Sequence, residues 1–305
     1  MNWLLIAIIA YFLYAIVFVV DKFLLSQTKL QPSVYAFYIG LFSGLAALVL
    51  IPFDFSIISI EQIIISFIAG ILFILATFFF YKSIQIGEVS RITPIIGGAI
   101  PIFTLILTYL FLGERLTINQ LIALCLLVFG GMIMLWPRKK IRIKQGMTKI
   151  PLIKRLPLAI LSALFFSGSF VLTKFIYNEL SFINSFIWIR IGGVIGSLLL
   201  LFSADLRKII FQVSKSIKTK TVKLAFFSKC LSALAFILLN YAIYLGSVTL
   251  VNALQGVQYV LLLVLALFLS KKFPKIIKEQ IGREVIIKKV LAILFISIGL
   301  GILVF

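Results

Sequence analysis

The stretch Phe182–Phe202, FINSFIWIRIGGVIGSLLLLF, decides the fold class of this chain. It holds one charged side chain, Arg190, near its middle, and about 20 predominantly apolar residues are enough for an α-helix to cross a bilayer. A guanidinium at mid-membrane costs about 2.5 kcal/mol or more even on the mildest scales. No carboxylate lies inside any comparable run of the sequence. We therefore expect Arg190 to face an aqueous cavity, where a lone cation suits an anionic solute.

The whole chain has the composition of a helical membrane protein. Of its 305 residues 63% are hydrophobic and 12% are charged, and the mean hydropathy is +1.22. Soluble domains lie near half apolar and a quarter charged. The apolar residues form long segments and lack the short alternating strands of a membrane β-barrel. We predict an all-α integral membrane protein whose ten transmembrane helices lie approximately at Asn2–Val20, Val34–Pro52, Ile63–Phe80, Ile92–Leu112, Ile118–Trp136, Leu156–Leu172, Phe182–Phe202, Leu224–Leu239, Val248–Leu269 and Val290–Phe305.

The basic residues lie on one side of this predicted arrangement. The net charge is +20, and 25 of the 29 lysines and arginines fall in alternate connections between the segments. The opposite connections hold only Arg115 and Lys174, while Arg190 and Lys229 lie within segments. By the positive-inside rule, this distribution places both termini outside the cytoplasm. We expect the charge to face the anionic headgroups of a lipid bilayer, with no nucleic-acid partner.

Residue types that support catalysis are scarce or badly placed. The chain has no histidine, and its nine acidic residues lie at segment ends or in connections. A membrane enzyme acting on a lipid-linked substrate would need histidine, paired acids or a metal cluster. Cys125 and Cys230 both fall inside apolar segments, so no disulfide framework is indicated. The sequence therefore predicts no enzyme, no catalytic residue, no metal and no cofactor.

The two halves of the chain resemble each other. A shift of 152 residues aligns Lys22 with Lys174, and a shift of 159 residues aligns Gly97 with Gly256. Five segments per half is an odd number, so the halves must cross the membrane in opposite orientations. Inverted repeats are a transporter design with the solute site at the repeat interface. We predict a first five-helix repeat at residues 1–140, a basic cytoplasmic linker at 141–155 and a second repeat at 156–305.

Two further segments carry polar or helix-breaking residues on one face. In the fourth segment Thr93, Pro94 and Pro101 indicate either a kinked wall of a cavity or a small-residue packing seam between helices. In the ninth segment the stripe of Asn252, Gln255 and Tyr259 indicates either solute contact or interhelical hydrogen bonding. Arg190 likewise fits solute contact or bonding to neighbouring carbonyls. Together the predicted substrate-binding set is Arg190, Asn252, Gln255, Tyr259, Thr93, Pro94 and Pro101.

A longer stretch of the first half resembles a known family. It runs from Pro94 and Pro101 through FLGERLT at Phe111–Thr117 to Gln120 and the Gly130–Gly131 pair. This pattern resembles the signature around the fourth and fifth helices of the drug/metabolite transporter superfamily, EamA type. The duplicated five-helix unit and the position of Arg190 fit as well. In the second half Lys271, Lys272 and Phe273 stand where the family has a Gly-Glu pair.

The resemblance implies alternating-access transport of small metabolites, often amino acids or other amphiphilic compounds and commonly as export. We predict an exporter of an anionic or zwitterionic small molecule, acting as monomer or homodimer in the plasma membrane of a prokaryotic cell. Proton-coupled multidrug efflux and a lipid scramblase or structural membrane protein are the alternatives. Family members are usually drawn with both termini in the cytoplasm, whereas the charge distribution places them outside.

Overall fold

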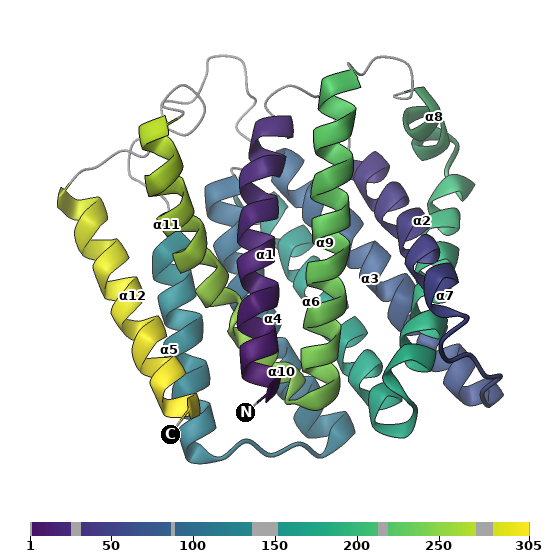
Figure 1. Ribbon diagram of the computed structural model, residues 1–305, viewed down its shortest axis with the longest axis horizontal. Helices are drawn as coiled ribbons and strands as arrows, with labels where there is room; N and C mark the ends of the chain where they lie inside the picture. The colour runs from purple at the N-terminus through teal and green to yellow at the C-terminus, as the bar shows by residue number, and fades with distance from the viewer. Residues whose placement is uncertain are drawn as a thin grey trace.

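The computed structural model describes residues 2–25, 32–86, 89–135, 152–212, 219–272 and 283–304 (Figure 1). All regular structure in these ranges is helical, which confirms the predicted all-α class. The predicted linker at 141–155 lies outside the described residues as far as 151, and the side chain of Pro94 also lies outside them. The helices are α1 Asn2–Leu25, α2 Pro32–Leu50, α3 Ile60–Ile86, α4 Val89–Leu107, α5 Ile118–Leu135, α6 Leu152–Glu179, α7 Phe182–Leu199, α8 Ala204–Gln212, α9 Thr219–Leu245, α10 Val248–Ala253, α11 Gln255–Lys272 and α12 Arg283–Val304, with a π-helix at Thr108–Leu112 and a 3₁₀-helix at Leu200–Phe202.

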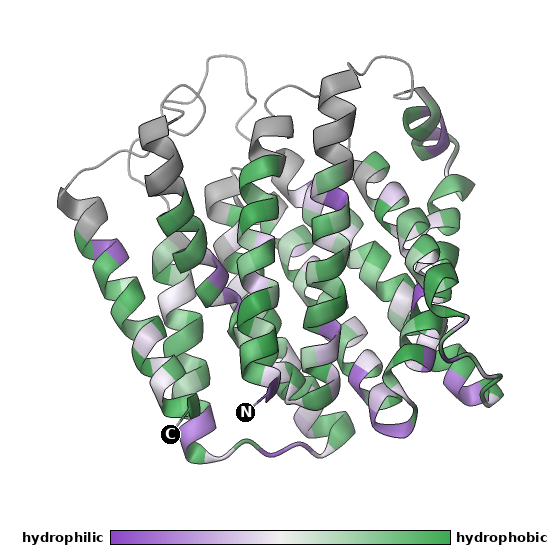
Figure 2. Ribbon diagram, viewed as in Figure 1, coloured by the Kyte–Doolittle hydropathy of each residue, from purple (hydrophilic) through white to green (hydrophobic). Residues whose placement is uncertain are grey.

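The helices have the length and apolar character of membrane spans. Within the described ranges, eight are long and apolar enough to cross a bilayer, and Ala36–Leu50 and Ile118–Met134 form two shorter apolar helices. Large apolar side chains such as Leu45, Phe129 and Ile298 are more than half exposed, and Figure 2 shows apolar residues along most of the helices. Such outward apolar surface needs lipid around it. The chain is thus a multi-pass membrane protein, and the count of ten spans stays a prediction.

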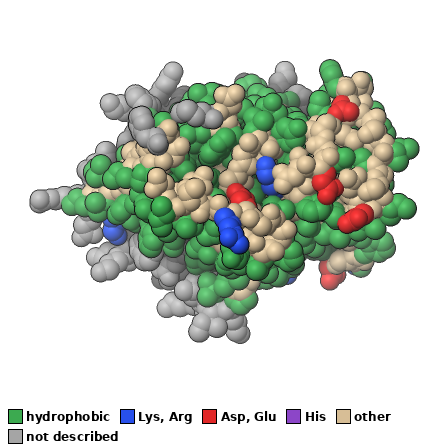
Figure 3. All heavy atoms as spheres, turned by 90° about the horizontal axis from the view of Figure 1, so that it is seen from below, with side chains coloured by type: hydrophobic (Ala, Val, Ile, Leu, Met, Phe, Trp, Pro, Cys, Tyr) green, Lys and Arg blue, Asp and Glu red, His purple; other side chains and the backbone are tan. Residues whose placement is uncertain are grey.

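The two halves of the chain are packed into each other. Helix α1 lies against α9, α3 lies against α6 and α7, and α5 lies against α12. Figure 1 shows both termini at the same end of the bundle, opposite the end that carries α8. Figure 3 views the end of the bundle at which the two termini lie, and acidic side chains are visible there. The acidic residues described in or next to the connections at this end are Asp54, Glu61, Glu114 and Glu179. The part of the basic connections that the structure describes lies at the opposite end of the bundle, together with α8.

Two predicted spans are less regular than the sequence indicates. The fourth segment remains α-helical past both prolines and then widens into the π-helix, which ends at Gly113 with a φ of 64°. That left-handed conformation suits glycine. The ninth segment is divided by a turn at Leu254, where the N–H of Val257 donates to the Leu254 carbonyl over 2.9 Å. No proline or glycine stands at position 254, so the sequence contains no signal for this division.

Two helices on the terminal side begin with the same capping arrangement. The N–H of Thr117 donates to Gln120 Oε1 over 2.9 Å, and the N–H of Gln120 donates to Thr117 Oγ1 over 3.3 Å. This is a capping box at the start of α5, in which two unpaired N–H groups find side-chain acceptors. Ser59 and Gln62 make the same exchange at the start of α3, with both distances near 3.2 Å. The same S-x-x-Q spacing is present in the sequence there.

Glycines allow α3 and α7 to approach each other closely. A Cβ added to Gly70 would overlap the backbone nitrogen of Gly193 and the carbonyl oxygen of Ile189. A Cβ added to Gly192 would lie 2.6 Å from Phe67 Cα. The two backbones are therefore in direct contact, as is common where membrane helices pack through small residues. This contact sits beside Arg190 on α7 and one turn from Phe73 on α3.

We expect Gly70→Ala to destabilise the protein by about 1–3 kcal/mol, because the new methyl group meets backbone atoms that cannot move aside. The midpoint of thermal unfolding in detergent would measure the loss. Gly301→Ala on α12 is the matched control, since no heavy atom lies within 4 Å of a Cβ placed there. Equal midpoints for the two variants would contradict the role given to the α3–α7 contact.

Candidate functional site

Arg190 is enclosed by aromatic rings from three helices. The guanidinium carbon lies 4.6 Å from the ring centre of Phe236 on α9, 5.2 Å from that of Phe186 on α7 and 5.4 Å from that of Phe73 on α3. The residue is 4% exposed. A cation within about 6 Å of a ring face is attracted by its quadrupole, by about 2 kcal/mol or more where water is excluded. The rings therefore offset part of the cost of burying the charge.

The hydrogen-bonding capacity of Arg190 is not met by these rings. Its Nε is buried and has no hydrogen-bond partner among the described residues. The ionisable groups near the guanidinium are the hydroxyls of Tyr14 on α1 and Tyr177 on α6, and no described carboxylate pairs with it. A guanidinium has five N–H donors in a fixed plane, which match a carboxylate in a two-point contact. The site thus presents a buried cation that has at least one N–H group, Nε, without a hydrogen-bond acceptor among the described residues.

A short chain of hydrogen bonds joins α6 to α9 near this cation. The hydroxyl of Tyr177 donates to Asn240 Oδ1 over 3.1 Å, and Asn240 Nδ2 donates to the Phe236 carbonyl over 2.9 Å. Asn240 is 2% exposed. Asn240 is absent from the residues predicted from the sequence, because the predicted span ended at Leu239, whereas α9 continues to Leu245. An asparagine directly after an apolar run was the available signal.

The predicted polar stripe of the ninth segment faces α4. Asn252 Nδ2 donates to Thr104 Oγ1 over 3.3 Å, and the hydroxyls of Thr108 and Thr249 lie 3.1 Å apart. All four residues are buried. These contacts of α4 and the π-helix with α10 are interhelical hydrogen bonds, one of the two roles that the sequence left open for Asn252.

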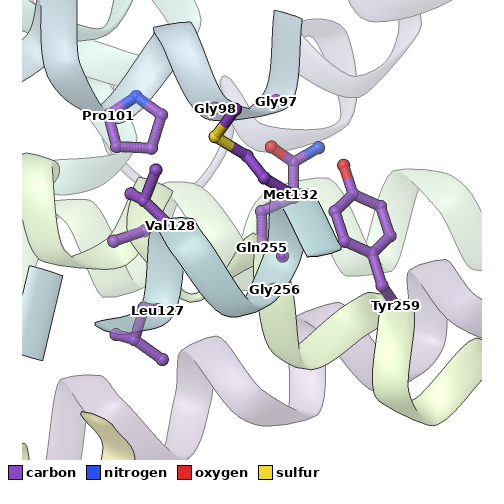
Figure 4. Close-up of a pocket in the computed structure, with 11 residues that line it drawn as sticks. Gly97, Gly98, Pro101, Leu127, Val128, Met132, Gln255, Gly256 and Tyr259 are labelled. Carbon is purple, nitrogen blue, oxygen red and sulfur yellow. The ribbon is translucent and has the colours of Figure 1, made fainter. Parts of the chain in front are cut away.

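Gln255, Tyr259 and Pro101 line one small cavity, shown in Figure 4. Its volume is about 10 Å³, close to the lower limit for one water molecule. The ring of Tyr259 points at α4, where its hydroxyl would be 2.8 Å from a Cβ on Gly97. Pro101 has no N–H to donate to the Gly97 carbonyl, four residues earlier. In this conformation the cavity is too small for a metabolite.

Buried side-chain atoms without a hydrogen-bond partner concentrate in the predicted set. Among the described residues they are Ser66 Oγ, Thr93 Oγ1, Arg190 Nε and Tyr259 Oη. Three of these four belong to residues proposed from the sequence. Because buried polar groups are normally paired, unpaired ones need a reason such as a ligand, water or a second conformation.

The predicted residues occupy two places joined by α1. Arg190 lies in the aromatic enclosure, whereas Pro101, Gln255 and Tyr259 lie around the cavity. On α1, Tyr14 is near Arg190, and one turn earlier the hydroxyl of Tyr11 donates to the Val251 carbonyl of α10 over 2.9 Å. Thr93 lies on α4, one turn before Gly97. The structure therefore does not bring all the predicted residues into a single pocket.

Lys174 lies at the carboxyl end of helix α9. Its Nζ donates to the carbonyls of Ile243 and Tyr244, both over 3.0 Å. A cation at the carboxyl end of a helix meets unpaired carbonyls and the negative end of the helix dipole. Lys174 is thus already engaged, unlike Arg190. Its predicted repeat counterpart, Lys22, has a side chain outside the described residues.

The bundle of long apolar helices defines a multi-pass membrane protein. Residues 1–136 match the EamA-like transporter family. This confirms the resemblance seen between Pro94 and Gly131. No curated protein matches the chain in sequence. One solved crystal structure shares its fold, with a TM-score of 0.70 and 15% identity over 99% of this chain and 95% of that chain.

We expect Phe236→Leu to lower the midpoint of thermal unfolding, because leucine keeps apolar volume and loses the ring face under Arg190. The loss should be about 0.5–2 kcal/mol for the cation–π contact, with a further contribution from the ring contacts to Phe73 and Phe186. Phe227→Leu in the same helix is the control, since that ring is 59% exposed. A similar change in both variants would mean that the ring does not stabilise the cation.

Proposed function

We propose that this protein exports a small anionic or zwitterionic metabolite by alternating access, with Arg190 as the group that holds the solute's negative charge. The observation that carries the proposal is the buried guanidinium with an unpartnered Nε and no described counter-ion. Burying a charge without a partner is costly, so a purely structural arginine would be paired. A bound anion supplies the missing partner.

The proposal includes ten transmembrane helices in two inverted repeats, residues 1–140 and 156–305. Its support is the pattern of helix neighbours. Helix α1 lies against α9 as α3 lies against α6, which is the same pairing with the halves exchanged. Helices α2 and α5 lie against α7 and α12, their own counterparts. This pattern fits a two-fold relation between the halves, and transporters of that design alternate by moving one repeat against the other.

The remaining predicted residues receive secondary roles in this proposal. Gln255 and Tyr259 contact the solute's polar groups when the α4–α11 wall moves, and Pro94 and Pro101 soften that wall by removing backbone hydrogen bonds. Thr93 lines the same wall, and Asn252 ties it to α10 through Thr104. Movement is required because the cavity beside Tyr259 has room for about one water.

The setting of the proposed transporter follows from the distribution of charge. We place it in the plasma membrane of a prokaryotic cell, as monomer or homodimer, with the basic connections against anionic headgroups and both termini outside. Efflux of hydrophobic cations is disfavoured, because Arg190 would repel them. Lipid scrambling, the alternative activity, would not require a desolvated arginine inside the bundle.

We expect Arg190→Gln to lower counterflow of the transported anion in proteoliposomes by about ten- to hundredfold, since charge-assisted hydrogen bonds contribute about 1.5–3 kcal/mol. The assay would screen labelled amino acids, organic anions and nucleotide-linked sugars. Arg115→Gln, the same substitution at an exposed position near the end of the bundle, should transport normally.

Two results would argue against the proposal in different ways, and a third would require another variant. Equal flux in wild type and Arg190→Gln would keep the transporter and remove Arg190 from the solute site. Absence of flux for every solute class, together with movement of dye-labelled lipid, would favour the scramblase. Loss of folding in Arg190→Gln, seen by size-exclusion chromatography, would shift the test to Arg190→Lys, which keeps the charge and loses the two-point geometry.

The orientation can be tested with single cysteines in a variant lacking Cys125 and Cys230. Ser59 and Ser203 are both exposed and lie at opposite ends of the bundle. We expect a membrane-impermeant maleimide to label Ser59→Cys on intact cells and Ser203→Cys only after permeabilisation. The opposite pattern would mean that both termini are cytoplasmic, as is usual for the family.

A further inference from the structure

We infer that the solute held by Arg190 is a monocarboxylate with an apolar, preferably aromatic, body and no ammonium group. This inference rests on the proposed function and narrows its substrate class. It excludes zwitterionic amino acids as the best substrates and favours hydroxy, oxo or simple carboxylic acids. The argument depends on charge, on hydrogen-bond acceptors and on the rings around the site.

The charge of the site matches one negative charge. Arg190 is the cation, and the nearby ionisable groups are the neutral hydroxyls of Tyr14 and Tyr177. Lys174, the other cation described on the neighbouring helix α6, is engaged by two backbone carbonyls at the end of α9. A dianionic phosphate ester would therefore bring one charge more than the site offsets. A carboxylate brings one charge and the planar geometry that a guanidinium fits.

The site offers little to an ammonium group. The described carboxylates, Asp54, Glu61, Glu114, Glu179 and Asp205, all lie at helix ends or in connections. A buried acceptor on α9, Asn240 Oδ1, already receives the hydroxyl of Tyr177. The faces of Phe73, Phe186 and Phe236 are turned to Arg190 itself. An α-ammonium group would thus stand close to a like charge without an acid to offset it, which weakens binding of the charged form.

The apolar part of the solute has an aromatic surface to lie on. Phe73 contacts Phe166, Phe170 and Phe236 with ring centres 5.4–6.4 Å apart, and Phe166 stacks on Phe170. These four rings are only partly buried, so part of the surface of the cluster stays accessible. Aromatic rings prefer offset or edge-to-face contact with other rings. An aromatic body next to the carboxylate therefore fits this cluster better than a sugar or a polar chain.

The test uses three solutes of nearly equal size: phenyllactate, phenylalanine and phenylalanine amide. They carry a carboxylate alone, a carboxylate with an ammonium group, and an ammonium group alone. In proteoliposomes we expect labelled phenyllactate to be exchanged, and unlabelled phenylalanine to compete at a concentration at least about tenfold higher, a ratio that like-charge repulsion at the site accounts for. Phenylalanine amide should not compete. Protein-free liposomes measure passive entry of the acid.

The outcomes separate this inference from the proposed function. Exchange of phenylalanine that equals or exceeds that of phenyllactate would overturn the inference and leave the transporter in place. No exchange of any of these three solutes, in a protein whose thermal unfolding midpoint is also unchanged by all three, would overturn the inference. The proposed function is contradicted only when the wider screen of amino acids, organic anions and nucleotide-linked sugars also shows no flux. A rise in that midpoint with phenyllactate alone would support the inference independently of transport.

A variant that adds one negative charge gives a second test. Asn240→Asp places a carboxylate one turn from Phe236 and beside Tyr177, so it should offset an ammonium group or neutralise Arg190 directly. In either case the preference for phenyllactate over phenylalanine should fall by about tenfold or more, since a single added charge is enough to reverse the balance. Asn119→Asp, at an exposed position on α5, should keep the wild-type preference. An unchanged preference in folded Asn240→Asp would overturn the inference, and the wild-type solute series decides it if that variant does not fold.

Discussion

A guanidinium buried among apolar helices without an acid is the constraint on which the rest of this structure depends. Its charge must be stabilised by whatever surrounds it, and the surroundings are ring faces from α3, α7 and α9. The ring of Phe73 comes close to the cation where glycines let the backbones of α3 and α7 touch beside it. The close packing of small residues therefore contributes to the electrostatic stabilisation of Arg190.

The arrangement stabilises the charge only in part. Ring faces attract a cation but replace few of the hydrogen bonds that it makes in water, and Nε remains without a partner. Elsewhere the described polar side chains inside the bundle are largely paired, through contacts such as Ser162 with the Ala76 carbonyl and Ser169 with the Ala69 carbonyl. The unpaired groups are concentrated at Arg190, Thr93 and Tyr259. A transporter must exchange its solute for water or for another solute, and partial satisfaction leaves the site able to do both.

Much of the fold was predictable because hydrophobic length and capping spacing are local properties of the sequence. The apolar segments coincide with helices, and the Thr117–Gln120 capping box forms as its spacing predicts. The π-helix after Leu107 and the turn at Leu254 were not predictable, since neither is marked by a residue that breaks a helix there. Both depend on how α4, α10 and α11 fit together. The ends of α9 were also misjudged, and with them the polar role of Asn240.

For the site, the sequence alone indicated that two cations, Arg190 and Lys229, lie within apolar segments, that acids are confined to the ends, and that basic residues gather on one side. These follow from counting and from position along the chain, because the bilayer penalises charge wherever it occurs in a span. Only the tertiary structure decided that Phe73, Phe186 and Phe236 surround Arg190, that Asn252 bonds to Thr104, and that Tyr259 faces Gly97. Those contacts join helices far apart in sequence, whose relative placement depends on side-chain shape and close backbone approach, which helical periodicity does not encode.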